Sequence, residues 1–177
     1  NAKVLIVSNS NFGPSKRLET LNKIKDGEYD TIIMTYSSFG MIELSPDYYK
    51  KKMLKEFDNY KNSSNNRYTC TSYVSKKASK EEDLKVDLFL LGERKEEAIY
   101  FDDLGIDRLF VDEAHNFKNI SLDTNIMALG INAEGSSKCN DMLNKVKYIQ
   151  SQNDGGGVVF ATGTPITNSI RDRKSVV

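Results

Sequence analysis

The sequence predicts an α/β fold in which a parallel β-sheet is flanked by helices, with a helical insertion in the middle of the chain. Two observations lead to this prediction. Four short apolar runs, at residues 3–8, 31–35, 108–112 and 158–162, have the composition of buried strands. Segments with apolar residues at helical spacing separate the first run from the second and the third from the fourth. Strands that alternate with helices are typical of a parallel sheet.

The first strand–helix–strand unit lies within residues 1–44, the predicted first part of the sheet domain. The runs KVLIVS (3–8) and TIIMT (31–35) are mainly apolar and β-branched, which predicts strands buried on both faces. A helix is predicted between them, because Pro14 is favoured in a first helical turn and Gly27 is a typical stop. Its apolar positions recur at helical spacing: Leu18, Leu21 and Ile24.

The second unit lies within residues 101–177, the predicted remainder of the sheet domain. Its strands are RLFVD (108–112) and VVFAT (158–162). Ser136 is a candidate cap for the helix between them, which ends before the turn sequence NDGGG. The apolar face of this helix is predicted to contain Met142, Leu143, Val146 and Ile149.

Residues 45–100 depart from this alternation and predict a helical insertion. Ser45 and Pro46 have the character of a cap and a first helical residue. A polar loop at 62–69 follows, and a second helix is predicted from Ser79 to about Glu97. The apolar positions of the two helices are Tyr49, Met53, Phe57 and Tyr60 in the first, and Leu84, Leu88 and Leu91 in the second.

Composition restricts the class of protein. With 38% hydrophobic and 28% charged residues, the 177-residue chain has the profile of a folded, soluble domain. No apolar run approaches the ~20 residues of a membrane span, so no membrane contact is predicted. Cys70 and Cys139 match no metal-binding spacing, which favours reduced thiols in the cytoplasm. The chain starts without Met or a signal peptide, so we expect a piece of a longer protein.

The charges are unevenly distributed although their sum is zero. Residues 50–80 contain nine Lys or Arg and two acids, whereas residues 81–113 contain twelve acids and four basic residues. Lys50, Lys51 and Lys52, with nearby tyrosines, are therefore candidates for binding the phosphate backbone of a nucleic acid. The same residues also fit a packed tyrosine stripe with a solvated lysine face, and both interpretations are kept.

The stretch LFVDEAHNFKN places Asp112, Glu113 and His115 directly after a predicted strand. Ligands of open parallel sheets bind at the carboxyl ends of the strands. An Asp in this position can hold Mg²⁺ through water, and an adjacent Glu can polarise the water that attacks a γ-phosphate. Asp112-Glu113-Ala114-His115 thus predicts a Walker B site of the DEAH kind. The alternative is an ordinary helix start, where acids are favoured by the helix dipole.

A second motif, VVFATGTPITNS (158–169), follows one predicted helix later. It is again a strand that ends in small hydroxyl and glycine residues, where a tight turn can approach a neighbouring strand end. Alone it also fits an ordinary strand followed by a Gly/Pro turn. Its position after VDEAH favours the functional interpretation.

Together, DRLFVDEAHNFKN and GVVFATGTPITNS resemble motifs II and III of superfamily 2 helicase-like ATPases, close to the Swi/Snf-type translocases. GEYDTIIMTYSSFGMI resembles motif Ib of the same proteins. The chain is also similar to the helicase portion of DNA methylase–helicase proteins carried by bacterial phages and mobile elements. The resemblance implies a partial RecA-like motor lobe that uses ATP and Mg²⁺ and binds DNA.

The resemblance also implies a role for each matching residue. Asp112 matches the Mg²⁺-binding position and Glu113 the water-activating one. His115 matches the residue that couples ATP state to DNA, through the motif III turn formed by Thr162, Gly163 and Thr164. The motif Ib loop, which touches the DNA backbone, corresponds to Thr35, Tyr36 and Ser37.

One expected motif is missing from the sequence: G-x-x-x-x-G-K-[ST] does not occur. We therefore expect the phosphate loop before Asn1, and a second motor lobe, with a DNA methyltransferase domain as a further candidate, elsewhere in the same bacterial or phage polypeptide. The predicted function is a fragment of an ATP-dependent DNA helicase or translocase, inactive alone. One alternative is a non-catalytic nucleic-acid-binding or scaffolding module. Another is a metal-dependent nuclease that uses Asp112, Glu113 and His115 with Asp102 or Asp103.

Overall fold

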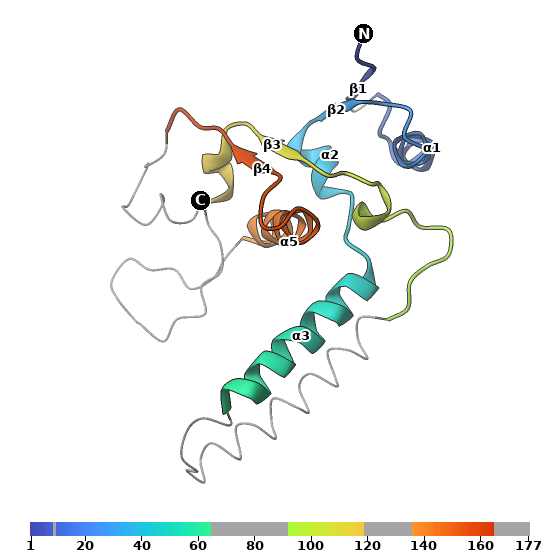
Figure 1. The fold of residues 1–177 in the computed structure, drawn as a ribbon. Coiled ribbons are helices and arrows are strands. Elements are labelled where there is room, and N and C mark those ends of the chain that lie inside the picture. The colour runs from blue at the N-terminus through green and yellow to red at the C-terminus, as the bar shows by residue number, and fades with distance from the viewer. Residues whose placement is uncertain (9, 65–91, 119–135, 165–177) are drawn as a thin grey trace. The chain divides into compact units, whose positions relative to one another are not determined.

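The computed structural model describes residues 1–8, 10–64, 92–118 and 136–164 (Figure 1). The chain divides into two compact units, each considered by itself below: residues 1–43 together with 99–177, and residues 44–98. Among the described residues, the first unit contains the strands β1 to β4 and the helices α1, α2 and α5. The second contains helix α3.

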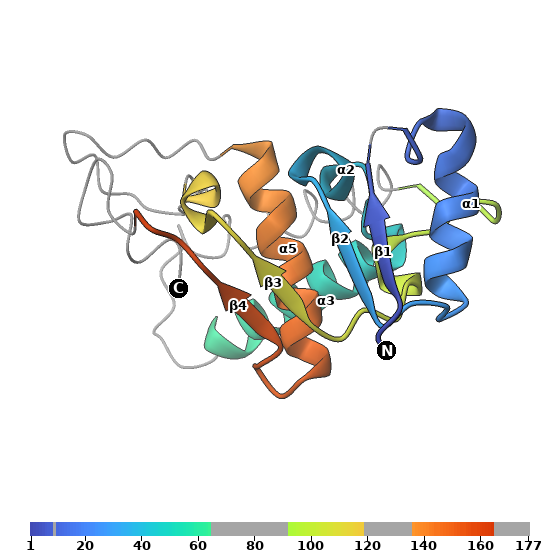
Figure 2. The ribbon, with the colours of Figure 1, turned by 90° about the horizontal axis from the view of Figure 1, so that it is seen from above.

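The strands of the first unit form two parallel pairs. β1 (Val4–Val7) pairs with β2 (Thr31–Met34), and β3 (Leu109–Val111) pairs with β4 (Val158–Phe160). Figure 2 shows the two pairs next to each other with all four strands running in the same general direction. The predicted strands and their parallel pairing are confirmed, but they form two two-stranded sheets, β1-β2 and β3-β4. Helices combined with small parallel sheets fit the predicted α/β class.

Helices cover one face of these sheets. In Figure 1, α1, α2 and α5 all lie on the same side of the strands. Side chains on this side are buried at the centre of the unit, with Val7 2% and Val111 3% exposed. This arrangement is expected, because right-handed crossovers that run in the same direction across a sheet place their helices on the same face.

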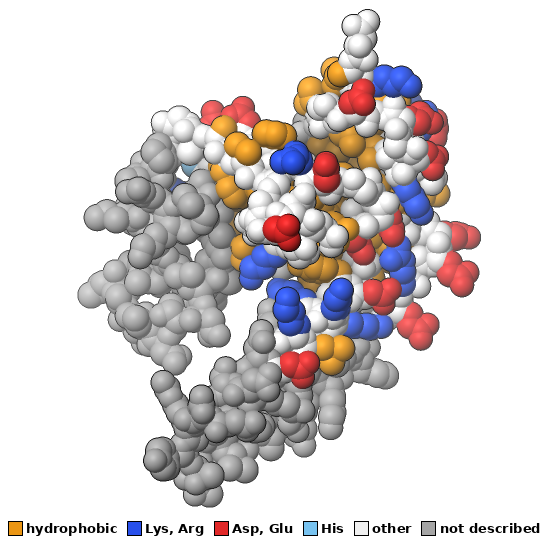
Figure 3. All heavy atoms as spheres, in the orientation of Figure 1, with side chains coloured by type: hydrophobic (Ala, Val, Ile, Leu, Met, Phe, Trp, Pro, Cys, Tyr) orange, Lys and Arg blue, Asp and Glu red, His pale blue; other side chains and the backbone are white. Residues whose placement is uncertain are grey.

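The other face of the strands is open, which contradicts the prediction of strands buried on both faces. Its apolar side chains are 48% to 73% exposed, and Figure 3 shows hydrophobic atoms at the surface over the strands. Within the described part of the chain no helix covers them. The residues on this open face are Val4, Ile6, Ile33, Phe110 and Val159.

The helices of the first unit begin and end close to the predicted residues. α1 (Pro14–Lys25) buries Leu21 and Ile24, and Gly27 follows it with φ +72°. Leu18, expected on the same apolar face, is 48% exposed. α5 (Ser137–Gln152) is preceded by Ser136 at its N-cap, as predicted. Of its predicted apolar face, Met142, Val146 and Ile149 are buried, whereas Leu143 is half-buried.

Two short elements complete the first unit. α2 (Tyr36–Gly40) follows β2, where the sequence predicted a loop, and η1 (Phe101–Asp103) precedes β3. Phe101 is fully buried and meets two rings edge-on, with centroid distances of 5.6 Å to Phe39 and 5.9 Å to Tyr148. Its N–H donates to the Glu43 carbonyl at 2.8 Å. These contacts join α2, η1 and α5 into the core beneath the strands.

In the second unit, α3 (Pro46–Ser64) begins at the predicted residue. The Ser45 hydroxyl accepts a hydrogen bond from the Tyr48 N–H at 3.2 Å, so Ser45 is the predicted helix cap. Most of the predicted second helix lies outside the described residues. Residues 92–97 are not helical, which corrects the predicted end near Glu97, because Gly92 has φ +67° and cannot lie within a right-handed helix. No helix among the described residues has the length and apolar character that crossing a membrane demands.

Candidate nucleotide and nucleic-acid site

The predicted acidic pair lies at the carboxyl end of β3. Both Asp112 and Glu113 are exposed, and the Asp112 Oδ1 accepts a hydrogen bond from the Glu113 N–H at 2.9 Å. The chain then enters the 3-10 turn η2 (Ala114–Phe117), not a long α-helix. Ligands of open parallel sheets bind at this end of the strands, so the acidic pair lies where the sequence predicts a ligand site.

Glu113 has a left-handed backbone, with φ 46° and ψ 45°. This conformation costs a residue with a side chain roughly 1–2 kcal/mol, so its neighbours must hold it in place. The Ala114 N–H donates to the Ala161 carbonyl at 2.9 Å, and the Ala161 N–H donates to the Val111 carbonyl at 2.8 Å. These two bonds extend the pairing of β3 with β4 past the strand ends. They fix the acidic pair relative to the turn that follows β4.

His115 joins the acidic pair to that turn. Its Nδ1 lies 3.1 Å from the Glu113 Oε2 and 3.1 Å from each of the Thr162 and Thr164 hydroxyl oxygens. The Thr164 N–H donates to the Thr162 hydroxyl at 3.2 Å, which closes the turn around Gly163. The structure thus brings the residues that match motifs II and III into direct contact. The coupling role assigned to them stays a prediction.

Tyr36, in the region that matches motif Ib, also lies near the acidic pair. Partial burial raises the pKa of its phenol above the usual value of 10, and the negative charges of Asp112 and Glu113 raise it further. Its ring packs edge-on against Phe117, with centroids 4.9 Å apart, and the Lys138 ammonium lies 4.7 Å from the Phe117 centroid. α2, η2 and the start of α5 therefore meet beside the acidic pair.

The remaining motif Ib residues have different surroundings. Thr35 is the N-cap of α2, and its hydroxyl accepts from the Ser38 N–H at 3.3 Å. This contact gives Thr35 a structural role besides the predicted one. Ser37 is exposed on the first turn of α2. The predicted DNA-binding residues Lys50, Lys51 and Lys52 lie on α3, in the other unit.

The acids of the nuclease alternative are not brought together. Asp102 and Asp103 lie in η1, before β3 begins, whereas Asp112 and Glu113 follow its end. The part of the chain that the structure describes contains no group of three or more His, Cys, Asp or Glu side chains able to hold a metal ion. The observed geometry therefore does not support the nuclease site.

One buried residue, Lys145 of α5, was missed by the sequence reasoning. Its side chain is fully buried, and its ammonium donates to the Phe39 carbonyl at 2.9 Å and to the Asp141 carboxylate at 2.7 Å. Burial lowers its pKa, and Asp141 partly opposes this shift. The sequence did contain a signal for this burial, because residue 145 lies three positions after Met142 and four before Ile149 and therefore falls on the apolar face of the helix. Through Phe39, Lys145 ties the end of α2 to α5.

The chain is similar in sequence to known proteins. Residues 1–175 match a family model described as "Probable helicase domain". The chain is also similar to the "Defense against restriction protein B" of Escherichia phage P1, with 31% identity over 80 residues. That match covers 44% of this chain and 4% of the phage protein, so the chain spans a small part of that relative's length. No solved structure matches the chain.

Proposed function

The chain belongs to the family described as "Probable helicase domain", and on that premise we propose that it is part of the ATP-driven motor of a longer DNA helicase or translocase. The more specific proposal is a superfamily 2 motor lobe of the DEAH, Swi/Snf-related kind. The observation that carries it is the contact of one His115 nitrogen with both Glu113 and the Thr162–Thr164 turn.

This nitrogen supports two alternative arrangements. When Nδ1 carries a proton, it can donate to the Glu113 carboxylate, which only accepts hydrogen bonds while ionised. When Nδ1 is unprotonated, it can accept from the Thr162 or Thr164 hydroxyl instead. A change at Glu113 can therefore alter which partner His115 binds, and so affect the turn after β4. Coupling of this kind requires two discrete arrangements with different energies.

The residues present suit a nucleotide-bound Mg²⁺. This ion binds through one or two carboxylates, with phosphates and water completing its shell, so a full protein cage is not expected. Asp112 is exposed, and its Oδ1 accepts a hydrogen bond from the Glu113 N–H, so its Oδ2 can face a bound ion or water. Mg²⁺, when bound, offsets the charge that develops on the phosphates. In this proposal Asp112 holds it through water.

Glu113 is the proposed water-activating residue. Its side chain is 56% exposed, so a water molecule can reach the carboxylate. Its left-handed backbone gives the side chain a direction that it would not have in a regular α-helix. The carboxylate can accept a proton from the attacking water at one oxygen while His115 contacts the other oxygen, Oε2. Asp112 and Glu113 thus have separate roles despite being adjacent.

We propose DNA as the nucleic acid. The name of the phage relative refers to defence against restriction, and we propose that the longer polypeptide acts on DNA in a related bacterial or phage setting, in the cytoplasm. Contact with the DNA backbone is assigned to Thr35, Tyr36 and Ser37 at the start of α2 and to Lys50, Lys51 and Lys52. A second motor lobe and a DNA methyltransferase domain are the proposed partners within the same polypeptide.

The experiment is an ATPase assay of the longer polypeptide and of its Glu113→Gln variant, with Mg²⁺ and DNA present. Removal of the catalytic carboxylate should abolish turnover, whereas Glu19→Gln on the exposed side of α1 should not change it. Hydrolysis that persists in Glu113→Gln at the unmodified rate would disprove the proposed role.

A further inference from the structure

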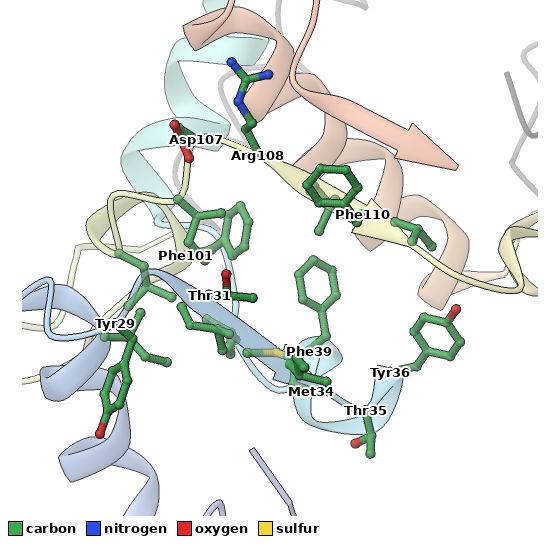
Figure 4. Close-up of a pocket in the computed structure, with 18 of the residues that line it drawn as sticks. Tyr29, Thr31, Met34, Thr35, Tyr36, Phe39, Phe101, Asp107, Arg108 and Phe110 are labelled. Atoms are coloured by element: carbon green, nitrogen blue, oxygen red, sulfur yellow. The ribbon is translucent and has the colours of Figure 1, made fainter. Parts of the chain in front are cut away.

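Tyr36 differs from its two neighbours in the direction of its side chain. Thr35 and Ser37 are exposed, whereas Tyr36 is half-buried. In Figure 4 the Tyr36 ring projects from the start of α2 toward the carboxyl end of β3, and the Thr35 side chain points another way. Tyr36 borders the same cleft as Asp112 and Glu113. Thr35 and Ser37 can therefore contact DNA while the Tyr36 ring faces the acidic pair.

The position of the Tyr36 ring is fixed by η2 and α5. Its plane stands at 88° to that of Phe117, with centroids 4.9 Å apart. Phe117 is buried and is the last residue of η2, the turn that starts directly after Glu113. The Lys138 ammonium lies 5.6 Å from the Tyr36 centroid and 4.7 Å from the Phe117 centroid. Edge-to-face rings and a cation beside a ring attract each other, so Tyr36 is held to the turn that adjoins Glu113.

The helix that carries Tyr36 is anchored at both ends. One helical turn after Tyr36, the Phe39 carbonyl accepts a hydrogen bond from the buried Lys145 ammonium at 2.9 Å. The same ammonium lies 4.4 Å from the Phe39 ring centroid. At the start of the helix, the Thr35 hydroxyl accepts from the Ser38 N–H at 3.3 Å. A side chain on an element locked in this way is pre-organised for a role at a site.

The phenol is the polar group that this arrangement brings beside the acids. A phenol can donate one hydrogen bond, and an ionised carboxylate only accepts, so the two are suited to each other. Burial raises the pKa of Tyr36, and the negative charges of Asp112 and Glu113 raise it further. The phenol therefore keeps its proton through the neutral pH range and remains a donor there.

We propose that Tyr36 is a positioning residue of the hydrolytic site, whose phenol orients the carboxylates of Asp112 and Glu113 through a hydrogen bond, made directly or through one water. The inference rests on the proposed function. It gives the Tyr36 ring a role that differs from DNA contact and from the link that His115 makes to the turn after β4. Loss of the phenol should therefore slow hydrolysis equally with and without DNA, whereas loss of His115 should change the ratio of the two rates.

Tyr36→Phe tests the role of the phenol, because it removes the hydroxyl and keeps the ring that packs on Phe117. In the longer polypeptide, kcat for ATP should fall about tenfold or more, while KM changes by less than about twofold. DNA affinity at constant salt should not change. Tyr148→Phe is the matched control, since burial and two acids, Asp102 and Asp103, also raise the pKa of Tyr148. Its hydroxyl donates to the Asp102 carbonyl at 3.1 Å, in η1 before β3, so kcat should stay unchanged.

Carboxyl carbon NMR provides a readout that does not depend on turnover. In the 177-residue chain, Tyr36→Phe should shift the side-chain carboxyl signals of Asp112 and Glu113, and Tyr148→Phe should leave both in place. Because phenylalanine keeps the ring, a shift reports the lost hydroxyl. Phe117→Leu, which removes the ring that holds Tyr36, should lower kcat when the phenol is present and should cause no further loss in Tyr36→Phe.

The outcomes separate this inference from the proposed function. An unchanged kcat, or unmoved carboxyl signals, in Tyr36→Phe would overturn the inference alone, provided that Glu113→Gln abolishes turnover. Weaker DNA binding with an unchanged kcat would also overturn it and would assign Tyr36 to DNA contact. Turnover that is unaffected by Glu113→Gln would refute the proposed function and the inference with it.

Discussion

Lys145 offers a quantitative test of the packing that holds α2 beside the candidate site. Lys145→Met keeps a flexible unbranched stem of similar length, so the apolar contacts of the side chain are largely retained. The lost interactions are the 2.9 Å bond to the Phe39 carbonyl and the 2.7 Å bond to Asp141. A buried carbonyl left without a donor costs about 1–3 kcal/mol. Asp141 is 28% exposed, so water can replace its lost partner at smaller cost.

We therefore expect Lys145→Met to lower the free energy of unfolding by about 1–3 kcal/mol. Asp141→Asn should be more destabilising, by about 3–5 kcal/mol, because it leaves a fully buried ammonium without its counter-charge. The measurement is urea denaturation followed by circular dichroism. Lys23→Met is the matched control: Lys23 has the same spacing and the same 2.7 Å distance to its acid Glu19, but both side chains are exposed. It should leave stability nearly unchanged.

The sign of the pH dependence follows from the lowered pKa of Lys145. Between its folded pKa and the ordinary value of 10.5, the unfolded chain binds more protons than the folded one. The contribution of Lys145 to stability should thus increase as pH rises through the alkaline range toward 10.5. The Asp141 and Glu43 carboxylates raise the pKa of Lys145 by less than burial lowers it, so they reduce this pH dependence without reversing its sign. The stability difference between the unmodified chain and Lys145→Met should change with pH in this direction. A Lys145→Met variant as stable as the unmodified chain at all pH values would refute the reasoning.

Three further predictions concern the candidate site and its surroundings. The titration of the Tyr36 phenol can be isolated as the difference in ultraviolet absorbance between the unmodified chain and Tyr36→Phe. The phenol should ionise above pH 10, and Glu113→Gln should lower its pKa toward the usual value. An unchanged pKa in Glu113→Gln would show that the acids lie too far from Tyr36 to affect it. Glu113→Gly should be more stable than Glu113→Ala by about 1 kcal/mol in denaturation, since only glycine adopts the left-handed backbone without strain; equal stabilities would indicate that the turn relaxes. Gly157→Ala should destabilise the chain more than Gly155→Ala. Both glycines have φ +88°, but only at Gly157 would an added Cβ meet neighbours, with the Asp107 carbonyl at 2.9 Å; equal losses would rule out the steric contribution.

Local sequence patterns predicted the elements better than their assembly. Pro14 and Gly27 delimit α1, and Ser45 and Ser136 precede α3 and α5, because caps and breakers act within a few residues. An apolar strand face, in contrast, indicates that the face should be buried, but it does not identify the element that buries it. The open face at Ile33 and Phe110 was therefore predicted as buried. The pairing of strands was also not readable locally, since it depends on residues far apart in the chain.

The candidate site shows the same limit. Asp112, Glu113 and His115 were identifiable because they are adjacent and follow an apolar run. The proximity of Tyr36 to the acids depends on how α2 and η2 pack, and short 3-10 and α-helical turns have little periodicity to reveal them. Lys145 was missed because a lysine is seldom fully buried unless it is paired, although its spacing from Asp141 indicated the pair.

The central claim is that His115 links the hydrolytic site to the turn after β4. The most direct measurement is the ratio of DNA-stimulated to basal ATPase rate in the longer polypeptide, for His115→Ala, Thr164→Ala and the double variant. Both single changes break one shared contact of 3.1 Å, so each should lower the ratio and the double variant should lose no more than His115→Ala. Fully additive losses, or a ratio unchanged in His115→Ala, would contradict the account.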